Sequence, residues 1–217
     1  MQRFISPVGF TPRIVTRSII ASGINAGDRL EILRPEQSDQ TNEQRTSNAI
    51  NDIEVTLSGV VSDVTVDVIT VRDTDFQAFT DECSELIMNG EDPVVCLGAG
   101  ATDLQFPLMV AAIAHSEYLA GVMVYSELTD TAQSVTIPMV TRTIPGRTQD
   151  TFAVLADRNQ QISLADLAEH LDVDRSTVTR HILALEEQGI VGTSTKGKEK
   201  MASLTILGRI LARNFVE

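Results

Sequence analysis

The chain has 217 residues, of which 42% are hydrophobic, and its formal net charge is −13. This length accommodates one mid-sized domain and one small domain, each with a hydrophobic core. No stretch approaches the length of a membrane span and the N-terminus lacks a signal-peptide pattern, so we expect a cytoplasmic protein with no membrane partner. Cys83 and Cys96 lack CxxC spacing. We expect buried reduced thiols there, the alternative being a disulfide or metal site.

The acidic charge is unevenly distributed along the chain. Residues 1–144 contain 20 acidic residues and 8 arginines, whereas residues 145–217 contain 10 acidic and 9 basic residues. Negative charge repels nucleic acid, so the strong excess of acid in the first segment argues against DNA binding there, while the nearly neutral second segment permits it. With 14 arginines and 3 lysines in all, the composition is typical of adaptation to concentrated salt, and we expect a halophilic source.

The first 143 residues alternate between strand and helix patterns. The hydrophobic spacing predicts strands at 4–8, 28–34, 64–70, 93–97 and 121–125, and an edge strand at 135–140. Between them it predicts helices at 12–24 and 103–117, and a helix that starts at Phe76 and ends at Asn89-Gly90. Residues 37–51 show no apolar periodicity and are predicted to form a loop before a helix that carries Ile50, Ile53 and Leu57. This order indicates an α/β fold, a Rossmann-like, mostly parallel sheet with helices on both faces.

Two turns, each between a strand and a helix, are predicted to form anion-binding sites. The first turn leads to Thr11 as a helix N-cap with Pro12 at the first helical position. The second leads into Thr102-x-x-Gln105, which reads as a capping box. Small residues let a ligand approach the backbone, and each helix N-terminus is electropositive. If the first and fourth strands are neighbours, both turns meet where such sheets bind ligands. The predicted contacts are Ser6, Pro7, Val8, Gly9, Phe10, Thr11, Gly98, Ala99, Gly100, Ala101, Thr102 and Asp103.

The alternative is that these glycines serve only to make tight turns. The spacing is not a dinucleotide fingerprint, because Asp103 stands where GxGxxG requires its third glycine. The second strand ends in Arg34-Pro35 rather than in an acidic residue that could bind a ribose. An NAD-dependent enzyme is therefore disfavoured.

Residues 145–217 follow the order of a winged helix-turn-helix domain. A helix carries Phe152, Val154 and Leu155, Ser163 caps a short helix at 164–171, a turn at 172–174 precedes a longer helix at 175–188, and a hairpin at 191–204 precedes a last helix at 205–215. Short hydroxyls and arginines on the longer helix can reach base edges and phosphates, and all three lysines of the chain lie at the hairpin tip. We predict contacts to double-stranded DNA from Arg175, Ser176, Thr177, Thr179, Arg180, Lys196, Lys198 and Lys200.

The alternative to DNA binding is a solvated helix face beside a chance basic turn. His181 adjoins the inward face of the longer helix, which favours a packed histidine over a base-reading one. His115 and His170 have no partners at metal-ligand spacing. We therefore expect no metal and no cofactor.

Three segments, SPVGFTPRIVTRSI, LGAGATD and SLADLAEHLDVDRSTVTRHILALEEQGIV, together resemble the archaeal CRISPR-associated transcriptional regulators, which have an N-terminal CARF sensor domain and a C-terminal winged helix-turn-helix (MarR-like) domain. The resemblance implies a homodimer whose paired CARF domains, residues 1–144, bind cyclic tetra-adenylate, a cyclic oligoadenylate. Its winged helices, residues 145–217, would bind promoters of CRISPR or adaptation genes. Many relatives have a basic residue after the glycine of the second turn, where this chain has Ala101-Thr102.

Two other functions remain open from the sequence. A ring nuclease would cut the same nucleotide, but neither turn contains the Lys or His that could orient a ribose hydroxyl and stabilise charge on phosphorus. A regulator whose Rossmann-like domain only dimerises would bind no nucleotide. We expect a receptor that is not an enzyme.

Overall fold

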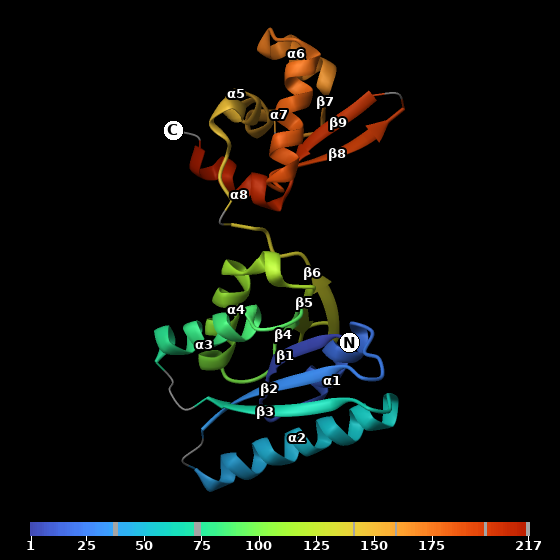
Figure 1. Cartoon of the computed structure of the whole chain (residues 1–217), viewed down its shortest axis with the longest axis vertical. Coiled ribbons are helices and arrows are strands. Elements are labelled where there is room, and N and C mark those ends of the chain that lie inside the picture. Colours follow the sequence, from blue (N-terminus) through green and yellow to red (C-terminus); the bar gives the residue numbers. More distant parts are fainter. Residues whose placement is uncertain (37–38, 72–74, 141, 159, 198, 216–217) are drawn as a thin grey trace. The chain divides into compact units, whose positions relative to one another are not determined.

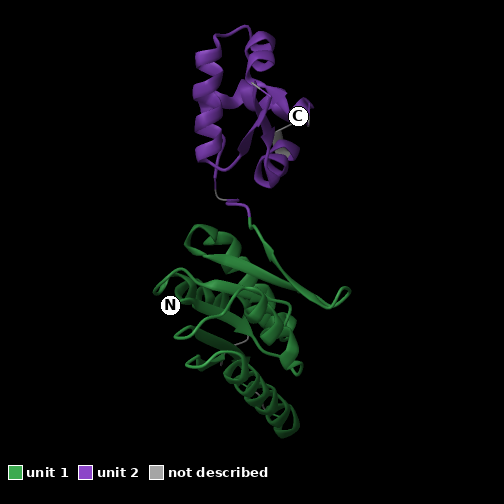
Figure 2. Cartoon of the chain, turned by 90° about the vertical axis from the view of Figure 1, so that its right-hand side faces the viewer, with its two compact units in different colours: residues 1–137 green, residues 138–217 purple. Residues whose placement is uncertain are grey.

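The computed structural model describes residues 1–36, 39–71, 75–140, 142–158, 160–197 and 199–215, which form two compact units. Unit 1 comprises residues 1–137 and unit 2 comprises residues 138–217 (Figure 2). The boundary expected after residue 144 lies inside unit 2. Among the described residues, no helix is both long and apolar enough to cross a membrane.

Unit 1 is built on one sheet in which the first strand lies at the centre. The sheet order is β3-β2-β1-β4-β5-β6, and every neighbouring pair is parallel except β5 and β6 (Figure 1). The predicted mostly parallel, Rossmann-like sheet is confirmed, as is the pairing of the first and fourth strands. The strands are β1 (Arg3–Pro7), β2 (Arg29–Pro35), β3 (Thr65–Val71), β4 (Val94–Leu97), β5 (Gly121–Ser126) and β6 (Thr131–Val135).

Helices cover both faces of this sheet because successive strand residues point to opposite sides. Phe4 packs in a core with residues of α1 (Pro12–Ala21) and α2 (Gln40–Val60), whereas its neighbour Ile5 packs with residues of α3 (Phe76–Met88) and α4 (Thr102–Ala114). A short 3-10 helix, η1 (Ser116–Tyr118), follows α4. Cys83 and Cys96 are buried free thiols, one in each core, and burial raises the pKa of each to about 12.

Two predicted elements of unit 1 are wrong. The segment expected to be a loop before residue 50 belongs to α2, whose N-cap Asp39 accepts a hydrogen bond from the backbone N–H of Thr41. Its early turns are polar because they bury only one narrow stripe, which begins with Thr46 and Ala49. The edge strand is β6 rather than 135–140. It is mostly polar, since an edge strand has fewer covered positions.

Unit 2 has the predicted winged-helix order. Its elements are η2 (Gly146–Thr148), α5 (Gln149–Arg158), β7 (Ile162–Ser163), α6 (Leu164–Leu171), α7 (Arg175–Glu187), β8 (Val191–Lys196), β9 (Glu199–Leu204) and α8 (Ile206–Phe215). The sheet order is β7-β9-β8. Ser163 caps α6 as predicted, because its hydroxyl accepts a hydrogen bond of 3.0 Å from the backbone N–H of Asp166. The expected inward residues Phe152, Val178, Ile182 and Leu185 are fully buried.

The core of unit 2 yields a first prediction at Gly208, in α8. A β-carbon at this position would lie 2.2 Å from the carbonyl oxygen of Ile190, so that the backbone would have to move. Replacing a glycine inside a helix by alanine normally stabilises by about 1 kcal/mol. We expect Gly208→Ala instead to destabilise unit 2 by about 1–3 kcal/mol through overpacking. Chemical denaturation measures this, with Gly146→Ala, where the space is open, as the control. Equal or higher stability of Gly208→Ala would contradict this packing.

Candidate ligand pocket and nucleic-acid interface

The β1–α1 turn and the β4–α4 turn are in contact. A β-carbon at Gly9 would lie 3.0 Å from the backbone nitrogen of Gly100, and one at Gly100 would lie 3.1 Å from the carbonyl oxygen of Val8. Gly98 and Gly100 have φ angles of 115° and 85°, which residues with a side chain rarely adopt. Glycine is thus needed both for the path of the second turn and for the close approach of the two turns.

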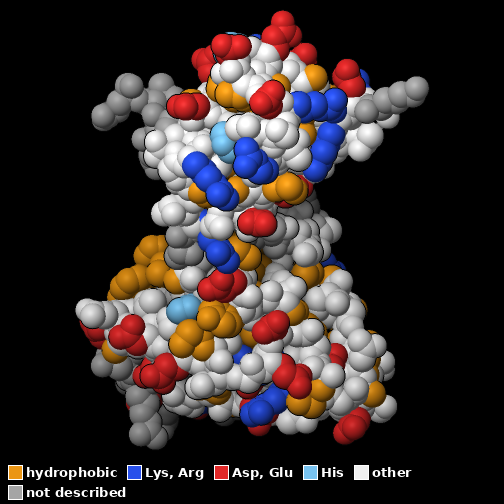
Figure 3. Space-filling model, turned by 45° about the horizontal axis from the view of Figure 1, so that its top comes forward, with side chains coloured by type: hydrophobic (Ala, Val, Ile, Leu, Met, Phe, Trp, Pro, Cys, Tyr) orange, Lys and Arg blue, Asp and Glu red, His pale blue; other side chains and the backbone are white. Residues whose placement is uncertain are grey.

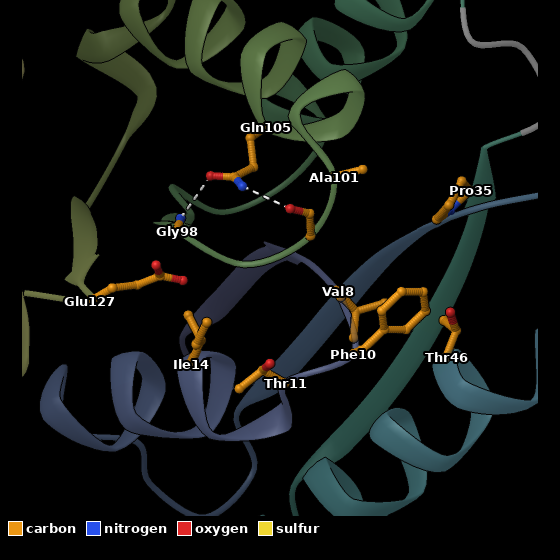
Figure 4. Close-up of a pocket in the computed structure, with 12 residues that line it drawn as sticks. Val8, Phe10, Thr11, Ile14, Pro35, Thr46, Gly98, Ala101, Gln105 and Glu127 are labelled. Carbon is orange, nitrogen blue, oxygen red and sulfur yellow. Dashed lines mark hydrogen bonds between the residues drawn. The ribbon is translucent and has the colours of Figure 1, made fainter. Parts of the chain in front are cut away.

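A pocket of about 340 Å³ opens where these turns meet (Figure 4). Its volume lies within the range of small-molecule sites. Seven of the predicted ligand contacts line it: Val8, Gly9, Phe10, Thr11, Gly98, Gly100 and Ala101.

Five predicted contacts are not part of the pocket lining. Ser6, Pro7 and Ala99 are buried beneath the turns, and the Ser6 hydroxyl donates a hydrogen bond of 3.1 Å to the carbonyl oxygen of Pro7. Thr102 and Asp103 are exposed in the first turn of α4. These five residues support the turns or flank the pocket in this structure.

Gln105 has a role that the capping-box prediction misassigned. The N-cap position of α4 is Ala101, so Thr102 lies inside the helix and makes no side-chain cap. The Gln105 side chain instead accepts a 3.2 Å hydrogen bond from the backbone N–H of Gly98 and donates one of 2.8 Å to the carbonyl oxygen of Gly100 (Figure 4). Gln105 therefore holds both ends of the glycine turn from inside the pocket.

The Thr11 cap is also only partly as predicted. Thr11 is the N-cap of α1 by position and Pro12 begins the helix, but the Thr11 side chain makes no capping hydrogen bond. Its hydroxyl faces the pocket instead (Figure 4).

Sequence reasoning missed five residues that line the pocket: Ile14, Pro35, Thr46, Gln105 and Glu127. Pro35 ends β2 and Glu127 follows β5. Both positions lie at the carboxyl edge of the sheet, where open α/β sheets bind ligands. Their location at the ends of predicted strands could therefore have identified them as candidate ligand contacts. Thr46 was missed because it lies in the segment that was predicted to be a loop.

The pocket has one charged residue in its lining, and an arginine packs against one of its lining rings. Glu127 lines one side, and within the described ranges its carboxylate has no hydrogen-bond or ion-pair partner. On the other side the guanidinium of Arg45 lies 3.9 Å from the centre of the Phe10 ring. The cation on this side is therefore held against the Phe10 ring, and Arg45 does not itself line the pocket.

A polar network ties the β5–β6 hairpin, and with it Glu127, to α1. The Asp130 carboxylate accepts hydrogen bonds from the Tyr125 hydroxyl and the Arg17 guanidinium, and lies 3.5 Å from Arg13. The hydrogen bonds from Tyr125 and Arg17 lower the pKa of Asp130. Because α1 begins at the pocket, this network fixes the hairpin relative to the first turn.

The geometry of the second turn yields a prediction at Gly100. We expect Gly100→Val to abolish ligand response and to leave unit 2 folded, because the new side chain would push against Pro7 and Val8 where the turns meet. Gly27→Val is a matched control, since Gly27 has a φ of 84° but open space around its β-carbon site. Both variants place a side chain at nearly the same positive φ, but only Gly100 is crowded and only Gly100 lines the pocket. Ligand-induced thermal shifts measure the response. An unchanged response in Gly100→Val would show that the ligand binds elsewhere.

The DNA contacts predicted on α7 lie mainly on its exposed side. Arg175, Ser176 and Arg180 are exposed, whereas Thr177 and Thr179 are half-buried. The Thr179 hydroxyl donates to the carbonyl oxygen of Arg175 at 2.8 Å, and Arg180 donates to the Thr177 hydroxyl at 3.2 Å. The two arginines and Ser176 are therefore the groups of α7 most accessible to a base edge or phosphate.

The β8–β9 hairpin forms the wing of unit 2. Lys196 ends β8, Lys200 lies in β9, and Gly197 turns the chain with a φ of 66°. Lys198 lies outside the described residues. Lys and Arg side chains gather on one face of unit 2 (Figure 3). This is the charge distribution required of a surface that neutralises phosphates.

His181 is half-buried and hydrogen-bonded, as expected of a packed histidine. Its Nδ1 lies 2.8 Å from the Thr151 hydroxyl. Burial, and then the nearby charges of Arg180 and Arg147, lower the pKa of His181. Among the described residues, no group of three His, Cys, Asp or Glu side chains could hold a metal ion.

The fold places the chain in the class of proteins with a Rossmann-like domain followed by a winged helix-turn-helix domain. Residues 2–138 match the Csa3 CRISPR-associated Rossmann-like domain, and residues 147–198 match a helix-turn-helix domain. The chain therefore belongs to the Csa3 family of CRISPR-associated proteins, and its second domain is a helix-turn-helix domain.

Solved structures with similar parts are more distant. They include the adhesin competence repressor AdcR of Streptococcus pyogenes (20% identity, TM-score 0.30, covering 34% of this chain and 55% of that chain). They also include ZitR of Lactococcus lactis (23%, 0.30, 33% and 55%) and S. aureus MepR bound to an oligodeoxyribonucleotide (22%, 0.31, 32% and 54%). The chain spans about half the length of these proteins. No curated protein matches.

The basic residues of α7 and of the wing yield a prediction on DNA binding. Arg175→Ala or Arg180→Ala should each weaken operator binding by about 1–3 kcal/mol, because each removes a possible base or phosphate contact. The Lys196→Ala, Lys200→Ala double variant should weaken all duplexes similarly and reduce the slope of affinity against salt by up to about 2 units. Arg213→Ala, an exposed base of α8, is the charge-matched control. Duplex titrations across a salt series measure these effects. Unchanged binding of random duplex by the double lysine variant would contradict the wing assignment.

Proposed function

We propose that the chain is a ligand-gated, homodimeric transcription regulator of CRISPR–Cas genes whose Rossmann-like domain binds a cyclic oligoadenylate, specifically cyclic tetra-adenylate. The observation that carries this proposal is the contact of the two turns beside a pocket that seven of the predicted ligand contacts line. The pocket adjoins the N-termini of α1 and α4, which favour anions such as phosphate.

The homodimer follows from the size and symmetry of the ligand. A pocket of about 340 Å³ lies near the lower end of small-molecule sites and accommodates only part of a four-nucleotide ring. A two-fold ring would be bound by two copies of the pocket, one from each chain, across a two-fold axis. The ligand would change DNA binding only if its affinity differs between two arrangements of the dimer.

The lining of the pocket supports a receptor rather than a ring nuclease. Glu127 is the only ionisable residue that lines the described pocket, and its charge is negative. Cleavage of a phosphodiester needs groups that stabilise negative charge on phosphorus, which a carboxylate opposes. A regulator whose Rossmann-like domain only dimerises remains the second candidate, because the glycines also serve the packing of the turns.

One experiment separates the three functions. The full-length protein is incubated with cyclic tri-, tetra- and hexa-adenylate, and both its melting temperature and the integrity of the nucleotide are followed. We expect cyclic tetra-adenylate to raise the melting temperature without being cleaved. Cleavage would establish a ring nuclease. The absence of both shift and cleavage would favour the dimerising regulator.

The acidity of residues 1–144 supports a halophilic, archaeal source as part of the proposal. With 20 acidic residues against 8 arginines there, self-repulsion should loosen the fold and dimer in dilute buffer, and molar salt should restore them by screening. DNA affinity should fall as salt rises, because duplex binding releases counterions. Thermal melts and duplex titrations across a salt series test both trends. Full stability in dilute buffer with no gain from salt would remove the halophilic assignment.

A further inference from the structure

One largely buried polar side chain of the pocket makes no hydrogen bond within the described protein. Thr46, on α2, is 2% exposed and lines the pocket, and its hydroxyl has no hydrogen-bond partner among the residues that the structure describes. Most threonines inside helices donate to a carbonyl of the preceding turn, as Thr56 does to Asp52 at 2.7 Å on the same helix. The small exposed part of the Thr46 side chain faces the pocket, so a ligand there can supply the hydrogen bond that the protein does not.

The surroundings of Thr46 suit a planar, uncharged ring. Phe10 and Pro35 line the same side of the pocket (Figure 4). Phe10 is 44% exposed, and the Arg45 guanidinium lies over its ring. Aromatic rings and guanidinium planes are the groups on which proteins stack nucleic-acid bases. The β1–α1 and β4–α4 turns lie on another side of the same pocket, and their small residues would let a phosphate come close to backbone N–H groups.

We infer that Thr46 and Phe10 form a base-recognition subsite, in which the Thr46 hydroxyl hydrogen-bonds the edge of a nucleobase held against the Phe10 ring. This inference rests on the proposed function and specifies which residues of that site read the base. A hydroxyl both donates and accepts, so it can pair with either type of group on the edge of adenine. The β1–α1 and β4–α4 turns hold the phosphate. The Thr46–Phe10 subsite distinguishes a nucleotide from a polyphosphate that has no base.

The test is Thr46→Val, which removes the hydroxyl and keeps the branched shape of the side chain. The dissociation constant of cyclic tetra-adenylate for the full-length protein is measured by calorimetry. We expect affinity to fall about 3- to 10-fold per site, and about 10- to 100-fold if two copies hold one two-fold ring. The melting temperature without nucleotide should stay nearly equal, because the removed hydroxyl makes no hydrogen bond among the described residues.

Two variants keep the result interpretable. Thr46→Ser retains the hydroxyl and should bind nearly as the wild type does. Affinity as weak as that of Thr46→Val would show that the methyl group matters and would overturn the inference. Thr56→Val, on the same helix outside the pocket, should leave the dissociation constant unchanged.

Failure of the inference and failure of the proposed function give different results. If the wild type binds cyclic tetra-adenylate and Thr46→Val binds it equally well, the subsite is wrong and the function stands. If the wild type binds none of the cyclic adenylates, both are wrong. A ring of 2′-deoxyadenylates separates base from sugar. The loss caused by Thr46→Val should persist with this ring, and its disappearance would assign Thr46 to the ribose and overturn base recognition.

Discussion

The candidate site of unit 1 depends on one backbone contact, that between the turn after β1 and the turn after β4. The parallel pairing of β1 with β4 brings the two turns to the same edge of the sheet, and the absence of side chains at Gly9 and Gly100 lets them touch. Gly98 adds a tight bend that lies against Tyr125 of β5. Gln105 then joins the two ends of the second turn by hydrogen bonds. The pocket is therefore defined largely by rigid backbone, which favours a preformed site.

Much of this site could be predicted from the sequence because its signals are local. Glycines after short apolar strands and a proline at the start of a helix identify turns with free backbone N–H groups, and the alternation of strand and helix places such turns at one sheet edge. The contact of the turns needed one further assumption, the adjacency of the first and fourth strands, which the structure confirms. In unit 2, the Ser163 cap and the spacing of apolar residues predicted the order of elements correctly for the same reason.

The parts that could not be predicted depend on contacts between distant segments. Thr46 lines the pocket because α2 starts at Gln40, after the N-cap Asp39, and so includes this residue. A threonine followed by an alanine does not indicate a buried helix face in the sequence. Gln105 fits a capping pattern, but its side chain instead hydrogen-bonds Gly98 and Gly100 in the turn that precedes α4. Glu127 follows a strand and has no local motif. Its position depends on the hairpin that Asp130 fixes to α1.

The unequal charge of the pocket has a consequence for selectivity. An anion bound at the β1–α1 and β4–α4 turns would be attracted by the partial positive charge of the N-termini of α1 and α4. It would be repelled by the carboxylate of Glu127, which lacks a cationic partner in the described structure. Arg45 offsets this repulsion only on the Phe10 side. A small inorganic anion would gain little from such a site, because it cannot reach both the turns and the ring. A nucleotide can place its phosphate near the turns, its base near Phe10 and a hydroxyl or amino donor toward Glu127. The pocket thus favours a ligand with both anionic and hydrogen-bond-donating groups, a requirement that the proposed cyclic adenylate would meet.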